Sequence, residues 1–205
     1  MRRSRGGIGR CGRGLANAVV EKPFDQEYFA RGMRKKTTAR LDFRKRIDAF
    51  LAAKKTVGGT PSWTPGNRTD ERRAVWLVLL NGQSVGATLQ ATAYPHEGAL
   101  RFTIGLEWPD CIWRLDFEPF YKHHPNAHTE VARLGVEPHI AGPHYHAWQD
   151  NRHLVRGARV GQLPVARAFR RIRKWEAAMR WFCGQTNIVM PTSQMLDFPR
   201  RDRLL

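Results

Sequence analysis

The sequence lacks a long apolar run, has few cysteines and is poor in acidic residues. The longest uninterrupted apolar stretch, Ala74–Leu80, has the length of a strand and is too short to cross a bilayer, so we expect no membrane partner. The three cysteines, Cys11, Cys111 and Cys183, are widely spaced and odd in number, which argues against a disulfide framework and a cysteine zinc site. This cysteine usage is typical of a cytoplasmic protein.

Basic residues outnumber acidic ones by 35 to 18, which leaves a formal net charge of +17. Residues 1–60 hold 16 basic and 5 acidic residues, and residues 156–205 hold 11 and 3, whereas residues 61–155 hold 8 and 10. A surplus sustained over whole segments favours a polyanionic partner, which we expect to be nucleic acid and RNA in particular. A merely solvated surface is the alternative interpretation of a charge run.

The composition also predicts a folded core, because 41% of the residues are hydrophobic and 10% are aromatic. We expect a single α+β domain over residues 37–190. Residues 1–36 are expected to form a basic flexible tail, unless the protein begins at Met33, and residues 191–205 a C-terminal tail.

A continuously apolar run at Ala74–Leu80, followed by segments in which apolar and polar residues alternate, predicts an antiparallel meander of four strands, with a fifth short strand further along the chain. Asn81-Gly82 between the first two strands is a strong signal for a hairpin turn. Residues 118–138 are expected to be loop, rich in proline and histidine. The expected strands cover residues 74–80, 85–94, 100–107, 111–117 and 140–148.

Helical periodicity predicts one helix before the meander and one after it. The first begins at Thr37 or Thr38 and runs to about Lys55. The second begins at Pro164, which suits the first position of a helix, and ends at Gly184. Both helices are expected to pack their apolar stripes on the apolar face of the sheet.

The basic outer faces of these two helices provide the candidate contacts to a nucleic-acid backbone. We expect this role for Arg44, Lys45, Arg167, Arg170, Arg171, Arg173 and Lys174.

Histidine carries the chemical signal of this sequence. Seven of the eight histidines lie in a 31-residue window that directly follows the strand bearing Arg114 and Asp116 on its polar face. Within the window, His144-Tyr145-His146 has the period of two that places both imidazoles on one side of a strand.

We expect these groups to cleave phosphodiester bonds by acid–base chemistry with no cofactor. Histidine titrates close to neutral pH, so a pair of imidazoles can take a proton from a ribose hydroxyl and return one to the leaving oxygen. An arginine would hold the phosphate, and a carboxylate would fix the tautomer of a histidine. The expected catalytic set is His144, His146 and His153, with Arg114, Arg152, Asp116 and Asp150 in support.

Two other interpretations of the histidines stay open. His144 and His146, with His153 as the third ligand (or His139 or Asp150), would bind zinc or another divalent metal, although the specific HExxH and CxxC motifs are absent. Alternatively the histidines are structural and bond loop carbonyls, which is the ordinary role of a single histidine and our expectation for His96 and His124.

The order of these parts resembles the small TumE-like toxins of bacterial toxin–antitoxin pairs, over about residues 111–153. In that family a sheet with a helix presents an Arg…Asp-Asn and a histidine-rich run, as Arg114-Leu115-Asp116 and His144-Tyr145-His146 do here. Phe117 stands where that family has the asparagine, and an Asp-Asn occurs instead at Asp150-Asn151. The resemblance implies a bacterial toxin-like protein that a partner antitoxin neutralises.

The expected function is therefore that of a basic, toxin-like ribonuclease with a histidine-rich site. The alternative is a non-catalytic nucleic-acid-binding or regulatory module, whose histidines are structural or hold one zinc ion.

Overall fold

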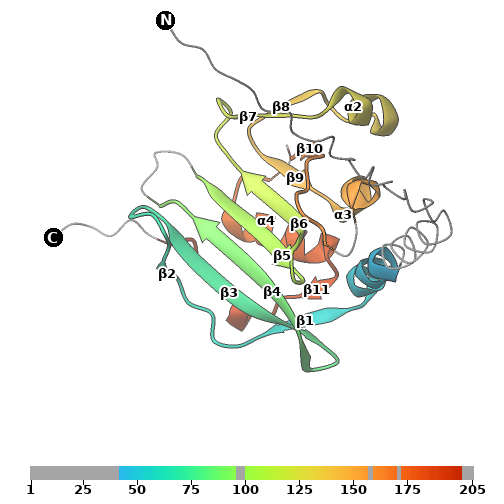
Figure 1. The fold of residues 1–205 in the computed structure, drawn as a ribbon. Helices are drawn as coiled ribbons and strands as arrows, with labels where there is room; N and C mark the ends of the chain where they lie inside the picture. Colours follow the sequence, from blue (N-terminus) through green and yellow to red (C-terminus); the bar gives the residue numbers. More distant parts are fainter. Residues whose placement is uncertain (1–41, 96–99, 157–158, 170–171, 200–205) are drawn as a thin grey trace, which may run out of the picture.

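The computed structural model describes residues 42–95, 100–156, 159–169 and 172–199 (Figure 1). The expectations for the tail at residues 1–36, for Met33 and for His96 lie outside these ranges, as do those for Arg170 and Arg171. Within the described residues the fold is α+β, as expected, with one large sheet and helices packed on one of its faces.

The large sheet has nine strands in the described part of the chain, in the spatial order β10-β9-β6-β5-β4-β3-β1-β11, with β2 paired to β3. β1 and β11 run parallel, and the other pairs are antiparallel. The strands of this sheet are β1 (Lys55–Gly58), β2 (Thr64–Pro65), β3 (Arg72–Leu80), β4 (Gln83–Ala93), β5 (Phe102–Glu107), β6 (Cys111–Phe117), β9 (His144–His146), β10 (Arg167–Ala168) and β11 (Ile188–Val189).

A second, two-stranded sheet pairs β7 (His123–Pro125) with β8 (His139–Ala141), and it lies with α2 at one end of the molecule beside β9 (Figure 1). The helical segments are the N-terminal helix (residues 42–52), α2 (His128–Leu134), α3 (Trp148–Asn151), η1 (Arg152–Leu154), α4 (Trp175–Gln185) and η2 (Thr192–Gln194).

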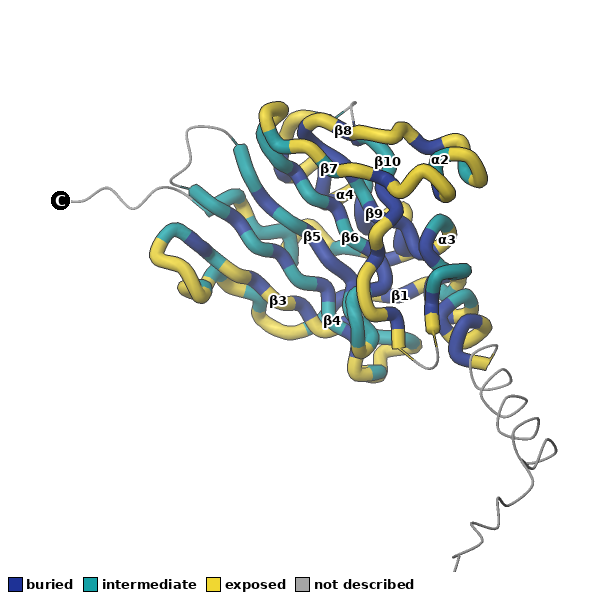
Figure 2. Tube along the Cα trace, turned by 45° about the horizontal axis from the view of Figure 1, so that its top comes forward, coloured by how far each residue is buried: buried dark blue, intermediate teal, exposed yellow. Residues whose placement is uncertain are grey.

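The predicted four-stranded meander is confirmed as β3 to β6. Asn81 and Gly82 connect β3 to β4 with φ angles of 51° and 77°, the positive values that a two-residue hairpin turn requires. Alternate residues of each strand point to the helices, and Figure 2 shows this alternation of buried and less buried positions along β4 and β6. On the opposite face of β3, Val75 and Leu77 are 49% and 46% exposed although the strand is central.

The two predicted helices pack on one face of this sheet. Ile47 and Phe50 of the N-terminal helix and Phe182 of α4 belong to the same core cluster as Trp76 and Trp113 of the sheet. The packed part of the chain extends past the predicted boundary at residue 190. The indole nitrogens of Trp76 and Trp175 donate to the carbonyls of Gln194 and Leu196 at 2.9 Å and 2.7 Å.

The predicted start of the C-terminal helix at Pro164 is wrong, since α4 begins only at Trp175. The backbone of Val165 exchanges two hydrogen bonds with the side chain of Asn151, at 2.8 Å and 2.9 Å, and Ala166 exchanges two with Asn126, at 2.9 Å and 3.0 Å. These paired bonds hold the chain extended, as a neighbouring strand would. The helix also continues through Gly184 to Gln185 rather than ending at this glycine.

The region between β6 and β9 is more ordered than predicted. The expected loop at residues 118–138 contains β7 and α2, and the expected strand at residues 140–148 is divided into β8 and β9. Gly142, with a φ of 77°, and Pro143 separate these two strands. Each strand is only three residues long, so alternation alone could not define its ends.

Candidate metal centre

β9 places His144 and His146 beside the polar side chains of β6. In the antiparallel pairing, Arg114 lies opposite His146 and Asp116 lies opposite His144, so all four side chains share the face of the sheet that the two packed helices leave uncovered. Tyr145, between the histidines, points to the other face, where its ring stacks on Trp113 at a centroid distance of 5.4 Å.

Asp116 is the polar centre of this group. Its Oδ2 accepts from Arg114 Nε at 2.6 Å, and its Oδ1 accepts from Thr103 Oγ1 at 2.9 Å. The Nε2 atoms of His146 and His144 lie 3.2 Å and 3.6 Å from Oδ2. Burial by itself raises the pKa of Asp116, but the His146 hydrogen bond and the charge of Arg114 outweigh it and hold this pKa well below its usual range. Asp116 is therefore a carboxylate.

His146 is fully buried, and His144 is 4% exposed. Burial lowers the pKa of His146 to about 4, despite the neighbouring carboxylate. His146 is therefore a neutral imidazole at pH 7, the form in which histidine binds metal ions.

His124 of β7 completes a cluster of three imidazoles. Its ring centroid lies 5.0 Å from that of His144 and 4.9 Å from that of His146. One nitrogen from each ring can serve as a ligand, and these three nitrogens lie within 4.8 Å of one another. Among the described residues, this cluster of His124, His144 and His146 is a group that could hold a metal ion.

One nitrogen of each imidazole lies near a hydrogen-bond acceptor. His144 Nδ1 is 2.9 Å from the carbonyl of Gly142, His124 Nε2 is 3.0 Å from the carbonyl of Pro164, and His146 Nε2 faces the Asp116 carboxylate. Carbonyl and carboxylate oxygens only accept, so a neutral imidazole that donates to one of them keeps a lone pair on its other nitrogen. This arrangement is typical of histidines that ligate metals.

His146 Nδ1, the nitrogen turned away from Asp116, is buried and has no hydrogen-bond partner. Arg114 Nη2 also lies 3.0 Å from His146 Nε2. A guanidinium only donates, so Arg114 and Asp116 favour opposite tautomers of His146. With the proton on Nε2, toward Asp116, the unpaired Nδ1 carries a lone pair.

The structure brings together four of the predicted catalytic residues: His144, His146, Arg114 and Asp116. The other three lie in separate ion pairs. His153 Nε2 is 3.0 Å from Glu130 Oε2 and also contacts Arg133, Arg152 is paired with Asp48 at 2.7 Å, and Asp150 with Arg167 at 2.7 Å.

The third ligand of the candidate metal set is therefore His124 and not His153. Sequence reasoning assigned His124 a structural role, because that is the ordinary role of a single histidine. In the sheet formed by β7 and β8, the ring of His124 lies against the rings of His144 and His146 of β9. The only sequence signal for it is its membership of the histidine-rich window.

The predicted nucleic-acid contacts are only partly on the surface. Arg44 is buried, and its Nη2 donates to the backbone carbonyls of His153 and Val155 at 2.7 Å and 3.2 Å, so its role is structural. Arg167 lies on β10 rather than on a helix. Lys45 is exposed on the N-terminal helix, while Arg173 and Lys174 are exposed in the segment before α4.

Comparison of the chain with protein-family models, with curated proteins and with solved structures finds no match. In the described part of the chain, no helix combines the length and the apolar character needed to cross a membrane.

Proposed function

We propose that His124, His144 and His146 bind a zinc-like divalent metal ion, with which the protein hydrolyses phosphodiester bonds in nucleic acid. The observation that carries this proposal is the convergence of the three imidazoles. Each offers a ligand nitrogen within 4.8 Å of the other two, each has a ring nitrogen near an oxygen acceptor, and Nδ1 of His146 is buried and unpartnered.

Burial favours a metal over direct acid–base catalysis by the histidines. A general acid or base must come within hydrogen-bond reach of the proton that it transfers. His146 has no exposed surface and His144 almost none, so a ribose hydroxyl cannot approach them directly. A metal ion in the cluster would turn these buried imidazoles into ligands and present its own open position to the substrate.

Three histidine ligands suit zinc chemistry, because they leave a fourth position for water or a phosphate oxygen. With Zn–N distances of about 2.0–2.1 Å, the nitrogens of a tetrahedral site lie about 3.4 Å apart, and the three nitrogens here lie within 4.8 Å of one another. Bound zinc lowers the pKa of water to about 7 and so supplies a hydroxide nucleophile at neutral pH.

Arg114 and His124 form the accessible side of the cluster. The side chain of Arg114 is 37% exposed, and His124 is half-buried. Arg114 donates through Nε to Asp116, which leaves guanidinium N–H groups for a phosphate oxygen. The charge surplus of the whole chain supplies attraction to the polyanion.

Cleavage of RNA by the metal-loaded protein tests this function. We expect wild-type protein to cleave single-stranded RNA, EDTA to stop the reaction, and added zinc to restore it. His144→Ala and His146→Ala should be inactive. His123→Ala is the matched control, because His123 is the exposed neighbour of His124 on β7, and this variant should cleave at the wild-type rate. Cleavage that continues in EDTA would contradict the proposal.

A second candidate function is that of a non-catalytic nucleic-acid-binding module with a structural zinc site, which the burial of His144 and His146 favours. Bound zinc and salt-sensitive RNA binding without any cleavage would select it. The toxin-like role and the partner antitoxin stay predictions, and growth arrest on expression of the protein in bacteria would test them.

A further inference from the structure

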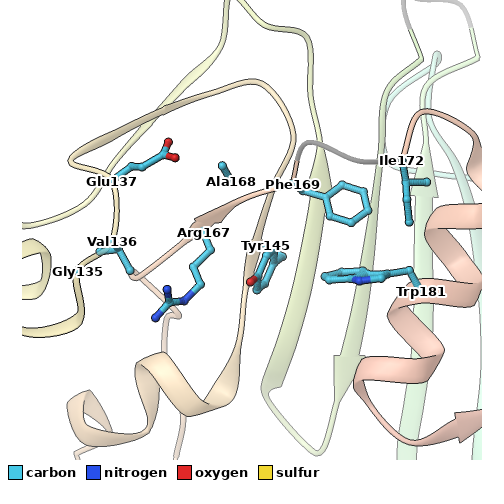
Figure 3. Close-up of a pocket in the computed structure, with 9 residues that line it drawn as sticks. All are labelled: Gly135, Val136, Glu137, Tyr145, Arg167, Ala168, Phe169, Ile172 and Trp181. Atoms are coloured by element: carbon cyan, nitrogen blue, oxygen red, sulfur yellow. The ribbon is translucent and has the colours of Figure 1, made fainter.

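A pocket of about 680 Å³ opens on the other side of β9 from the histidine cluster (Figure 3). It lies between the segment that follows α2, the strands β9 and β10, and α4. Tyr145 of β9 lines it, and the neighbouring His144 and His146 point to the opposite face of the sheet. The pocket and the candidate metal centre therefore share one three-residue strand.

We propose that this pocket binds an unpaired base of a single-stranded nucleic acid. The inference rests on the proposed function and names the feature of the substrate that this second site would recognise.

Three aromatic rings form one wall of the pocket. Trp181 of α4 packs on Phe169 at a centroid distance of 4.5 Å and on Tyr145 at 5.1 Å. Figure 3 shows the side chains of Trp181 and Phe169 lying next to each other. Tyr145 and Trp181 are only half-buried, so part of each ring remains open to a ligand. Stacking on such rings is the general way in which proteins bind bases of single strands without reading their sequence.

Arg167 supplies a polar group of fixed orientation on another side of the pocket. Its Nε and Nη2 donate to the two carboxylate oxygens of Asp150 at 2.7 Å and 2.8 Å, and its side chain keeps 37% of its surface exposed. The carboxylate largely neutralises the guanidinium, so this pocket is a poor site for a free phosphate. A planar guanidinium held in place can instead stack on a base or donate to its edge.

One exposed basic side chain next to the pocket suits a charged strand. Arg173 is exposed directly after the pocket residue Ile172, while Glu137 brings an acidic group to the lining. A bound strand would place its base among the aromatic rings and a phosphate near Arg173.

Fluorescence anisotropy with two labelled probes separates base binding from phosphate binding. The first probe is an oligothymidylate of about twelve nucleotides, and the second is an abasic strand of the same length and charge. Trp181→Leu removes a wall of the pocket. Trp63→Leu is the matched control, because Trp63 is also a half-buried tryptophan packed on another aromatic ring, at a site outside the pocket.

We expect Trp181→Leu to weaken binding of oligothymidylate by about 5- to 100-fold and to leave binding of the abasic strand unchanged. Trp63→Leu should change neither. Equal binding of oligothymidylate by both variants and the wild type would overturn the proposal. So would an equal loss for both probes, or no binding of oligothymidylate by the wild type.

A crosslinking measurement on the wild-type chain does not depend on the folding of any variant. A strand with 5-iodouracil in place of thymine should crosslink on irradiation to Tyr145, Phe169 or Trp181, and crosslinks confined to other residues would overturn the proposal. The two proposals fail separately: chelator-sensitive cleavage of RNA with no effect of Trp181→Leu rejects the pocket alone. An effect of Trp181→Leu without cleavage rejects the hydrolase alone.

Discussion

At the residue scale, the Asp116 carboxylate contacts side chains from three strands, β5, β6 and β9. It accepts from Thr103 of β5 and from Arg114 of its own strand, and it faces His146 of β9. A carboxylate behind a metal-bound histidine fixes the tautomer of the ring and makes it a better ligand. Asp116 is thus a positioning residue for His146 and is not one of the three residues of the cluster.

Asp116→Asn should weaken zinc binding by about 10- to 100-fold, because the amide keeps the size of the side chain but loses the charge that orients His146. Competition with a chromophoric chelator measures this affinity. Asp70→Asn is the control, since Asp70 pairs with the exposed Arg68 at 3.2 Å, and its zinc affinity should match the wild type. An unchanged affinity for Asp116→Asn would show that the carboxylate does not support the metal ligand.

Lys55 makes a pH-dependent contribution to stability at the end of the N-terminal helix. Its side chain is fully buried, and Nζ donates to the carbonyls of Phe50, Leu51 and Ala53 at 2.7, 3.3 and 2.6 Å. Burial lowers its pKa from 10.5 to about 8. Between these two values the unfolded chain holds a proton that the folded chain has released, so the free energy of unfolding rises with pH.

Lys55→Met isolates this effect, because methionine has a similar length and does not titrate. The free energy of unfolding of the wild type, relative to that of Lys55→Met, should rise from pH 8 to about pH 10.5, by at most about 1.4 kcal/mol per pH unit. Urea unfolding at several pH values measures it. A difference that is constant over this range would show that the pKa of Lys55 is not lowered.

At the element scale, the pattern of apolar and polar residues predicted the strands of the meander correctly, but it wrongly predicted a helix for the segment before α4. β4 and β5 alternate apolar residues with polar residues or glycine, β6 does so from Trp113 to Phe117, and β3 is a short apolar run that ends at a hairpin turn. By contrast Val165, Phe169 and Ile172 have helical spacing and yet lie before the helix. What keeps this segment extended is the pairing with Asn126 and Asn151, which are 40 and 14 residues away in the sequence.

Asn151→Ala should lower the free energy of unfolding by about 2 kcal/mol or more, because it leaves a buried N–H and a buried carbonyl of Val165 without partners. Denaturant unfolding gives the value. Asn67→Ala removes an exposed asparagine and should change stability by less than about 0.5 kcal/mol. Equal stability of the two variants would mean that the Asn151 pairing does not hold the segment.

At the scale of the whole molecule, one sheet separates the candidate metal centre from the aromatic pocket. Four residues of the centre could be predicted, because His144 and His146 alternate and Arg114 and Asp116 lie on an adjacent strand. His124 could not, because it reaches the cluster only through the second sheet. The burial of Arg44 could not be predicted either, since the sequence of a helix does not show which backbone carbonyls its basic side chains will contact.

The net charge of +17 predicts salt-dependent binding of RNA by the intact protein. Each phosphate contact with a single strand contributes about −0.7 to the slope of log K against log salt. Several contacts should therefore weaken binding at least about tenfold between about 50 and about 200 mM salt, as measured by fluorescence anisotropy. A slope near zero would contradict the prediction that the partner is a nucleic acid.

The most direct test of the candidate metal centre is the zinc content of the purified chain and of three single variants, measured by mass spectrometry of the metal. We predict one zinc ion per wild-type chain and per His153→Ala chain, and none in His124→Ala or His146→Ala. These variants separate the cluster in the structure from the set containing His153, which is paired with Glu130. A wild-type chain without zinc after exposure to the metal, or full zinc retention by His124→Ala, would contradict the account.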